Sequence, residues 1–254
     1  MIHSHTSNAS GFPRIVDVGL NGMLVTFSDV LTDDANGAAL AFREAVNDLD
    51  LDGISETSTS LTSAFVTFDP LVLEQAVLRD ALHELAEDRD WSKAKLPANR
   101  VRWIIPAVLG GDVTGPQLEE AARLADVSAE EAITELCAKP LRVMTLGFAP
   151  GQPYLGSLPE NWAIPRQTGL TKRVPVGAIT VAIRQIVLFS TSAPTGWRQV
   201  GLCGFKAFRR EAAQPFALRP GDEIQFRAVS AAEYDDIQAR DQSGDGGASR
   251  QDIL

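Results

Sequence analysis

The stretch Gly147-Phe148-Ala149-Pro150-Gly151-Gln152-Pro153-Tyr154-Leu155-Gly156 gives the clearest indication of how this chain folds. It follows an apolar run at residues 143–146, so a buried strand is expected to end where it begins. Three glycines and two prolines in ten residues predict irregular backbone, because glycine permits positive φ and proline removes a hydrogen-bond donor. Phe148, Tyr154 and Leu155 add large apolar side chains. The stretch is therefore either a packed connection that plugs the end of a sheet or barrel, or the wall of a ligand cleft.

Short runs with the pattern of β strands lie on both sides of this stretch. They are separated by glycine and proline clusters and occupy residues 141–146, 178–183, 186–189, 197–200 and 223–226. A further run at residues 101–109 precedes two helical segments, residues 117–125 and 129–137, and Ser128 and Glu131 have the spacing of a capping box. Strands this short, divided by turns, predict a β barrel or sandwich rather than a parallel α/β sheet.

The residues before this β-rich part have a different pattern. Four strands are predicted, at residues 15–18, 23–27, 55–58 and 63–68. Gly19-Leu20-Asn21-Gly22 predicts a tight turn between the first two, and helical periodicity follows Thr32 and Asp69-Pro70. Two strands, a helix, two strands and a helix predict an α/β sandwich. The expected organisation is a flexible arm, an N-terminal α/β domain, a linker, a barrel domain and an acidic, disordered tail, at residues 1–12, 13–88, 89–100, 101–230 and 231–254.

The composition of the 254-residue chain limits its class and its partners. Hydrophobic residues make up 44% and charged residues 22%, as in a folded globular protein. The net charge of −10 argues against a nucleic-acid partner, and no apolar run is long enough to span a membrane. The N-terminus lacks a signal-peptide pattern, and Cys137 and Cys203 lack disulfide or zinc spacing. We expect a cytoplasmic protein with reduced thiols, no metal site, and neither nucleic acid nor membrane as a partner.

Several catalytic classes lack the residues that they require. The histidines are His3, His5 and His83, all before the predicted barrel, so neither a Ser-His-Asp nor a Cys-His site is expected in the barrel. The chain contains no Gly-x-x-x-x-Gly-Lys-Ser/Thr loop to bind nucleotide phosphates. The residues alone therefore identify no catalytic group.

Four residues of the barrel are candidates for ligand binding. Arg166 and Arg173 gather positive charge in an acidic protein, and they are either solvated loop charges or partners for a carboxylate or phosphate. Gln185 lies between two apolar runs, so its amide is expected either to bridge backbone groups or to contact a ligand. Tyr154 offers a hydroxyl at the end of the opening stretch, and Trp197 is either core or a stacking surface.

The order of motifs along the chain resembles the carboxyltransferase subdomain C and D family. After residues 147–158, the matching pieces are Pro165-Arg166, Arg173-Val174-Pro175-Val176-Gly177, Gln185, Pro194-Thr195-Gly196-Trp197 and Arg219-Pro220-Gly221-Asp222. The family includes the B subunit of bacterial 5-oxoprolinase, the first subunit of allophanate hydrolase and the Kip-type inhibitor of a sporulation kinase. The resemblance implies an α+β fold, in which a small N-terminal α/β sandwich is followed by a cyclophilin-like β barrel.

The resemblance also implies a function. Family members of the 5-oxoprolinase type pair with a homologous C-type subunit, and with an A-type subunit, in an ATP-dependent complex that opens 5-oxoproline to glutamate. ATP is then the implied cofactor. In this interpretation Arg166 and Arg173 hold anionic groups, while Gln185 and Tyr154 orient them in a cleft shared with the partner.

The chain departs from the family pattern where chemistry is expected. The family's Gln-Thr-Gly-Ile-Tyr-Pro run is Gln185-Ile186-Val187-Leu188-Phe189-Ser190 here, and Cys137 replaces a usual histidine. These changes remove polar groups from the implied cleft. Two alternatives therefore stay open, a non-catalytic regulator that inhibits a sensor histidine kinase and an orphan module that binds small acids.

Overall fold

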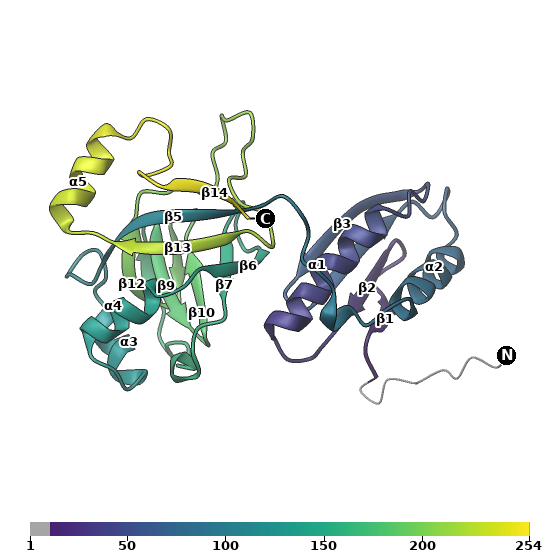
Figure 1. Ribbon diagram of the computed structural model, residues 1–254, viewed down its shortest axis with the longest axis horizontal. Helices are drawn as coiled ribbons and strands as arrows, with labels where there is room; N and C mark the ends of the chain where they lie inside the picture. The colour runs from purple at the N-terminus through teal and green to yellow at the C-terminus, as the bar shows by residue number, and fades with distance from the viewer. Residues whose placement is uncertain (1–10, 254) are drawn as a thin grey trace. The chain divides into compact units, whose positions relative to one another are not determined.

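The computed structural model describes residues 11–253, which form two compact units divided between Pro97 and Ala98 (Figure 1). Residues 1–10 of the expected arm lie outside the described residues. The first unit is an α/β sandwich and the second contains a closed β barrel, which confirms the predicted α+β class.

The first unit is a four-stranded antiparallel sheet with two helices. The strands follow the order β1-β2-β4-β3. Its elements are β1 (Arg14–Asp17), β2 (Gly22–Thr26), α1 (Asp33–Asn47), β3 (Ile54–Ser60), β4 (Ser63–Phe68) and α2 (Gln75–Glu87). Alternate residues of β4, namely Ala64, Val66 and Phe68, are buried in one core with Phe42 of α1 and Leu78 of α2. This alternation is what the period of two in the sequence predicts for a sheet covered on one face.

Two expectations about this unit are wrong. Helix α2 begins at Gln75 rather than at Asp69-Pro70, because Asp69 closes a separate turn in which its carboxylate accepts from the Leu71 N–H at 2.9 Å. The expected linker is also partly folded. Trp91, in the short 3₁₀ helix Trp91–Lys93, is 4% exposed and packs edge-on against Phe42 with ring centroids 5.0 Å apart. Its indole N–H donates to the Leu85 carbonyl at 3.1 Å, so this segment completes the first core.

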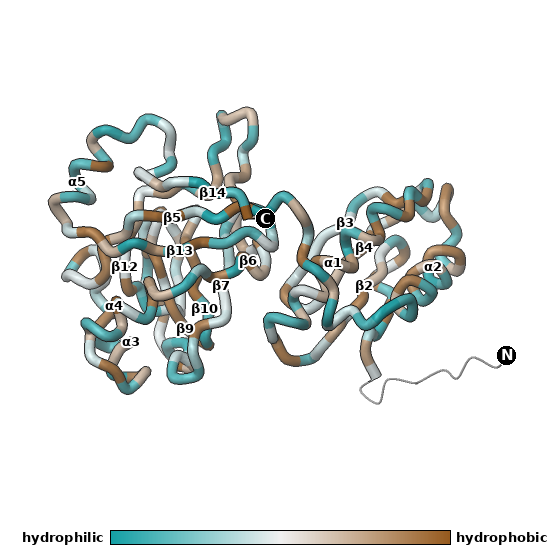
Figure 2. Tube along the Cα trace, in the orientation of Figure 1, coloured by the Kyte–Doolittle hydropathy of each residue, from teal (hydrophilic) through white to brown (hydrophobic). Residues whose placement is uncertain are grey.

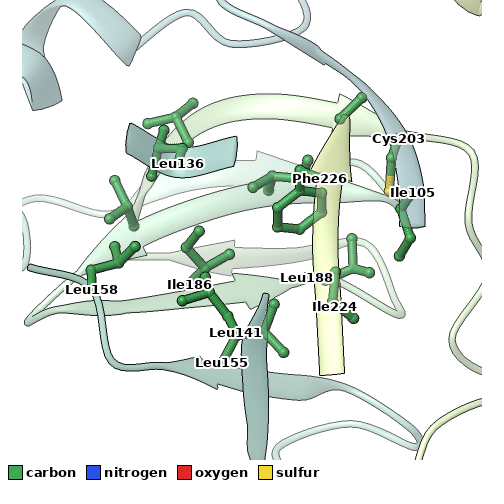
Figure 3. Packing of buried hydrophobic residues seen from close by; sticks show 14 of the residues in the cluster. Ile105, Leu136, Leu141, Leu155, Leu158, Ile186, Leu188, Cys203, Ile224 and Phe226 are labelled. Atoms are coloured by element: carbon green, nitrogen blue, oxygen red, sulfur yellow. The ribbon is translucent and has the colours of Figure 1, made fainter. Parts of the chain in front are cut away.

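The second unit is organised around a seven-stranded barrel. Its strands follow the order β12-β9-β10-β7-β6-β13-β5, and β12 also pairs with β5, which closes the ring. The β strands of this unit are β5 (Arg100–Leu109), β6 (Leu141–Leu146), β7 (Pro153–Gly156), β8 (Thr171–Val174), β9 (Ala178–Ala182), β10 (Gln185–Leu188), β11 (Ala193–Thr195), β12 (Arg198–Cys203), β13 (Glu223–Ala228) and β14 (Ser249–Ile253). Figure 3 shows side chains from several of these strands pointing toward one another, among them Leu155, Ile186 and Phe226.

Two short helices connect β5 to β6. They are α3 (Leu118–Leu124) and α4 (Ala129–Cys137). The predicted capping box is present, since Ser128 accepts from the Glu131 N–H while the Glu131 carboxylate accepts from the Ser128 N–H at 2.9 Å. Leu136 of α4 packs into the barrel core. Within residues 11–253, no helix combines the length and the apolar character needed to cross a bilayer.

The last four residues of the opening stretch form strand β7, which corrects the expectation of irregular backbone there. Strand β7 pairs with both β6 and β10, and Tyr154 lies opposite Thr145 on one side and Val187 on the other. Pro153 is tolerated because it is the first residue of the strand, where a missing N–H costs little. Leu155 is fully buried, whereas Phe148 is 70% exposed. The stretch therefore completes the barrel wall at one end and turns outward at the other.

The acidic tail is folded rather than disordered. Helix α5 (Ala231–Arg240) is capped by Ser230, and β14 pairs antiparallel with β5 from Ser249 opposite Ile104 to Ile253 opposite Arg100. Figure 2 shows this segment as largely hydrophilic. Its order comes from strand pairing on an open edge of β5 rather than from burial of apolar side chains, so its composition gives no sign of it.

The two thiols differ in their surroundings, and this predicts different reactivity. Burial raises the pKa of the Cys203 thiol to about 12, and it also raises the pKa of the half-buried Cys137 thiol. Because only the thiolate is nucleophilic, we expect iodoacetamide at pH 8 to label Cys137 slowly and Cys203 not at all in the native protein. Mass spectrometry of the labelled protein measures this, with urea-unfolded protein as the control in which both react. Fast labelling of Cys203 in the native protein would contradict the burial.

Candidate functional site

A second apolar cluster lies on the face of β9 and β10 opposite to the main core. We call it the Tyr154 cluster; it contains the half-buried Tyr154 and the buried Val174, Ala178, Ala182, Val187, Phe189, Ala193 and Trp197. Strands β8 and β11 pair with each other and contribute Val174 and Ala193. This cluster brings the opening stretch, the arginine-containing segment and the start of β12 into contact.

Tyr154 and Trp197 form the aromatic part of this cluster. Their ring centroids are 6.0 Å apart and their planes are inclined by 79°, an edge-to-face contact. Trp197 is 7% exposed, so it is core rather than a free stacking surface. The Tyr154 hydroxyl makes no hydrogen bond to the described residues, so it is available to a ligand or partner.

Gln185 has a buried side chain with an unmet donor. It is the first residue of β10, lies opposite Ala182 and is 5% exposed. Its Nε2 group has no hydrogen-bond partner among the described residues, so the amide does not bridge backbone groups through this nitrogen. A buried donor left unpaired costs about 1–3 kcal/mol, so a ligand, a partner chain or a buried water molecule is expected to supply the missing acceptor.

Arg166 and Arg173 are exposed at the edge of the same cluster. A methyl group on Gly196 would lie 3.5 Å from both Nε and Nη2 of Arg166, so this guanidinium rests beside the residue that precedes Trp197. Arg173 directly precedes the buried Val174 on β8. Neither arginine forms an ion pair with a carboxylate of the described chain. Both guanidiniums are thus free to receive an anion.

A set of hydrogen bonds fixes the segment that carries Arg166. Arg198 Nη1 donates to the Pro165 carbonyl at 2.6 Å, and Arg198 Nε donates to Glu120 Oε1 of α3 at 2.9 Å. Gln167 donates from its backbone N–H to the Gly196 carbonyl at 2.7 Å and from Nε2 to the Trp197 carbonyl at 3.1 Å. The arginine segment is therefore held against β12 on both sides of Arg166.

A cavity of about 330 Å³ opens beside this segment. It is lined by Glu120, Gln167, Thr168, Gly169, Leu170, Thr171 and Arg198. None of the four predicted site residues lines it, and neither Glu120 nor Arg198 was predicted from the sequence. Arg198 carried a signal that could have found it, since it is a charged residue inside the strand predicted at residues 197–200.

The structure thus brings the four predicted residues to one region but not to one cavity. Tyr154 and Gln185 lie on neighbouring strands of the same sheet face, Arg166 lies beside Gly196, and Arg173 is the exposed neighbour of the buried Val174 on β8. The arrangement offers a phenol hydroxyl, an amide donor and two guanidiniums, which can orient an anionic or carbonyl-containing molecule. The only histidine in the described residues, His83, is in α2 of the first unit.

Comparisons with known proteins agree with this architecture. The family described as "Carboxyltransferase domain, subdomain C and D" matches residues 13–218. The B subunit of the 5-oxoprolinase of Bacillus subtilis (strain 168) is 28% identical over 235 residues, which cover 87% of this chain and 95% of that protein. The crystal structure of TTHA0988 has a TM-score of 0.69 at 27% identity, over 83% of this chain and 40% of that longer chain. The urea carboxylase of Kluyveromyces lactis has a TM-score of 0.71 at 15% identity, over 94% of this chain and 24% of that chain, a likeness of fold alone.

Proposed function

Because this chain belongs to the carboxyltransferase subdomain C and D family, we propose that it is one component of a cytoplasmic, ATP-dependent complex that opens a lactam of the 5-oxoproline type. The observation that carries this proposal is the relationship to the B subunit of 5-oxoprolinase, which extends over nearly the full length of that protein. A homologous C-type subunit and an A-type subunit are the proposed partners.

The Tyr154 cluster supports a site that is completed by another chain. Gln185 Nε2 is buried and unpaired, and Arg166 and Arg173 are exposed without counterions. Such groups are stabilised when a partner or ligand supplies acceptors and negative charge. We propose that Arg166 and Arg173 hold anionic groups, while Gln185 and Tyr154 orient the substrate carbonyl.

The phosphate groups of ATP are the part of the molecule for which this region of the chain offers binding partners. Exposed guanidiniums are suited to phosphate oxygens, and Arg166 and Arg173 are of this kind. In the proposed reaction, ATP supplies a phosphoryl group that activates the amide oxygen of the ring. Ile186 and Phe189 replace the threonine and the tyrosine of the family pattern, so two hydroxyl groups are lost, and we assign the remaining catalytic groups to the partner chains.

The test is reconstitution of the complex. The chain is co-expressed with its C-type and A-type partners, and 5-oxoproline-stimulated ATP hydrolysis is measured. Arg166→Ala and Arg173→Ala are each expected to lower kcat/KM by about tenfold or more, because a hydrogen bond to a charged group contributes about 1.5–3 kcal/mol. Arg210→Ala serves as the control, since this arginine is 86% exposed and lies outside the site. An assembled complex that is inactive, or that is insensitive to both changes, would overturn the proposal.

A further inference from the structure

Arg198 on β12 is a charged residue in a buried position. Its side chain is 8% exposed, and its Nε donates to Glu120 Oε1 at 2.9 Å. Taking a guanidinium out of water costs free energy, and an apolar side chain of similar volume often gives equal or greater stability at such a position. The stability of the barrel therefore does not require an arginine here. The second contact of the guanidinium indicates a different role.

That second contact fixes the peptide bond before Arg166. Arg198 Nη1 donates to the Pro165 carbonyl at 2.6 Å, and this carbonyl belongs to the planar peptide unit that joins Pro165 to Arg166. On the other side of Arg166, the Gln167 N–H donates to the Gly196 carbonyl at 2.7 Å. Both peptide units that flank the Arg166 Cα are thus hydrogen-bonded. The direction in which its exposed side chain leaves the backbone is therefore set.

The side chain of Gln167 connects the same segment to helix α3. Its Oε1 accepts from Gln117 Nε2 at 2.7 Å, and its Nε2 donates to the Trp197 carbonyl at 3.1 Å. Gln117 directly precedes α3, and its own Oε1 accepts from the Gln199 N–H at 2.9 Å. Glu120, the ion-pair partner described above, belongs to α3 as well. One helix and one strand therefore hold the segment through a connected set of hydrogen bonds.

We propose that Arg198 and Gln167 are positioning residues for the anion that Arg166 binds, an inference that rests on the role of Arg166 in the proposed function. Neither residue contacts the anion. They restrict the backbone of Arg166 before binding, so less conformational freedom is lost when the guanidinium meets a phosphate or carboxylate, and such preorganisation raises affinity. Loss of either positioning residue should weaken anion binding although Arg166 itself is unchanged.

The experiment is an NMR titration of the full chain, without nucleotide or partner subunits, with inorganic pyrophosphate as the probe. We expect saturable shifts of the backbone amides around Arg166. Methionine is unbranched and of similar length, so Arg198→Met removes the hydrogen bonds with little change in packing, and we expect about tenfold weaker binding. Arg100→Met is the matched control and should bind normally, since Arg100 also bonds a carboxylate, Glu223 at 3.4 Å, and a carbonyl, Gly221 at 3.2 Å, but at the start of β5.

A double-mutant cycle separates positioning from a general effect on the fold. Arg166→Ala should itself weaken pyrophosphate binding about tenfold, with Lys172 and Arg173 leaving a measurable remainder. If Arg198 acts through Arg166, adding Arg198→Met to Arg166→Ala should change the affinity by less than about twofold.

Gln167→Met keeps the backbone N–H and loses the side-chain bonds, so it should follow the same pattern with a loss of about fivefold, and it carries the test if Arg198→Met does not fold. Equal losses with and without Arg166, or no saturable binding to the unchanged chain, would overturn the proposal. Because no turnover is measured, an inactive reconstituted complex would overturn the proposed function and leave this result in place.

Discussion

Replacing Gly177 with alanine is expected to lower the free energy of unfolding of the barrel unit by about 3 kcal/mol or more. Gly177 has a φ of +81°, and a Cβ at this position would lie 2.1 Å from the Cys203 carbonyl oxygen. That oxygen cannot move away easily, because the Cys203 N–H donates to Gly177 O at 3.0 Å while the Gly177 N–H donates to Phe189 O at 2.8 Å. Alanine would therefore separate β9 from the end of β12.

Urea denaturation, with hydrogen exchange at the amides of β9 as a probe of the barrel alone, measures this change. Gly169→Ala is the matched control, because Gly169 lies a few residues earlier, has no positive φ, and has no atom within 4 Å of the place that the added methyl group would take. The control should change the free energy of unfolding by no more than about 0.5 kcal/mol. If Gly177→Ala is as stable as Gly169→Ala, the close approach at Cys203 is not a constraint on the fold.

Trp162→Ala is expected to cost about 3–5 kcal/mol, the range for removing a buried aromatic side chain. Trp162 is 0% exposed in the main barrel core, and its indole N–H donates to Glu135 Oε2 of α4 at 2.6 Å. The substitution removes the ring and leaves the Glu135 carboxylate without this donor. Both effects lower the free energy of unfolding.

Thermal and urea unfolding of the purified variant measure the loss. Trp162→Phe keeps most of the apolar volume and should retain more stability than Trp162→Ala. Phe148→Ala is the control for removing an aromatic side chain from the surface, since Phe148 is 70% exposed. A loss for Trp162→Ala no larger than that for Phe148→Ala would show that this ring does not hold α4 to the barrel.

The sequence predicted the strands whose stability comes from burial. The runs at residues 141–146 and 223–226 became β6 and β13 because their apolar residues face a core, and the period of two is visible in the letters. Strand β7 was missed because its neighbours are glycines and prolines, and its order comes from pairing on both sides with β6 and β10. Such pairing is a long-range property that a local pattern does not contain.

The candidate site shows the same difference between features that a local sequence pattern contains and features that depend on long-range contacts. Gln185 was identified as a polar residue inside an apolar run, and its burial is confirmed. The ion pair between Arg198 and Glu120 was not predicted, because 78 positions separate the two residues in the sequence. Only the packing of α3 against β12 brings them together. Arg166 and Arg173 were selected by their charge and by the family resemblance, and neither signal contains the contact of Arg166 with Gly196 or the burial of Val174 beside Arg173.

The pairing of β5 has a consequence for how the protein folds while it is being synthesised. This strand, at residues 100–109, is bordered by β12, β13 and β14, so all three of its partners are made at least about ninety residues later. The first unit can fold while the second is still being translated, but β5 must wait with its backbone groups unpaired. During that interval the unpaired backbone and the apolar side chains of β5 leave it open to aggregation or to capture by a chaperone.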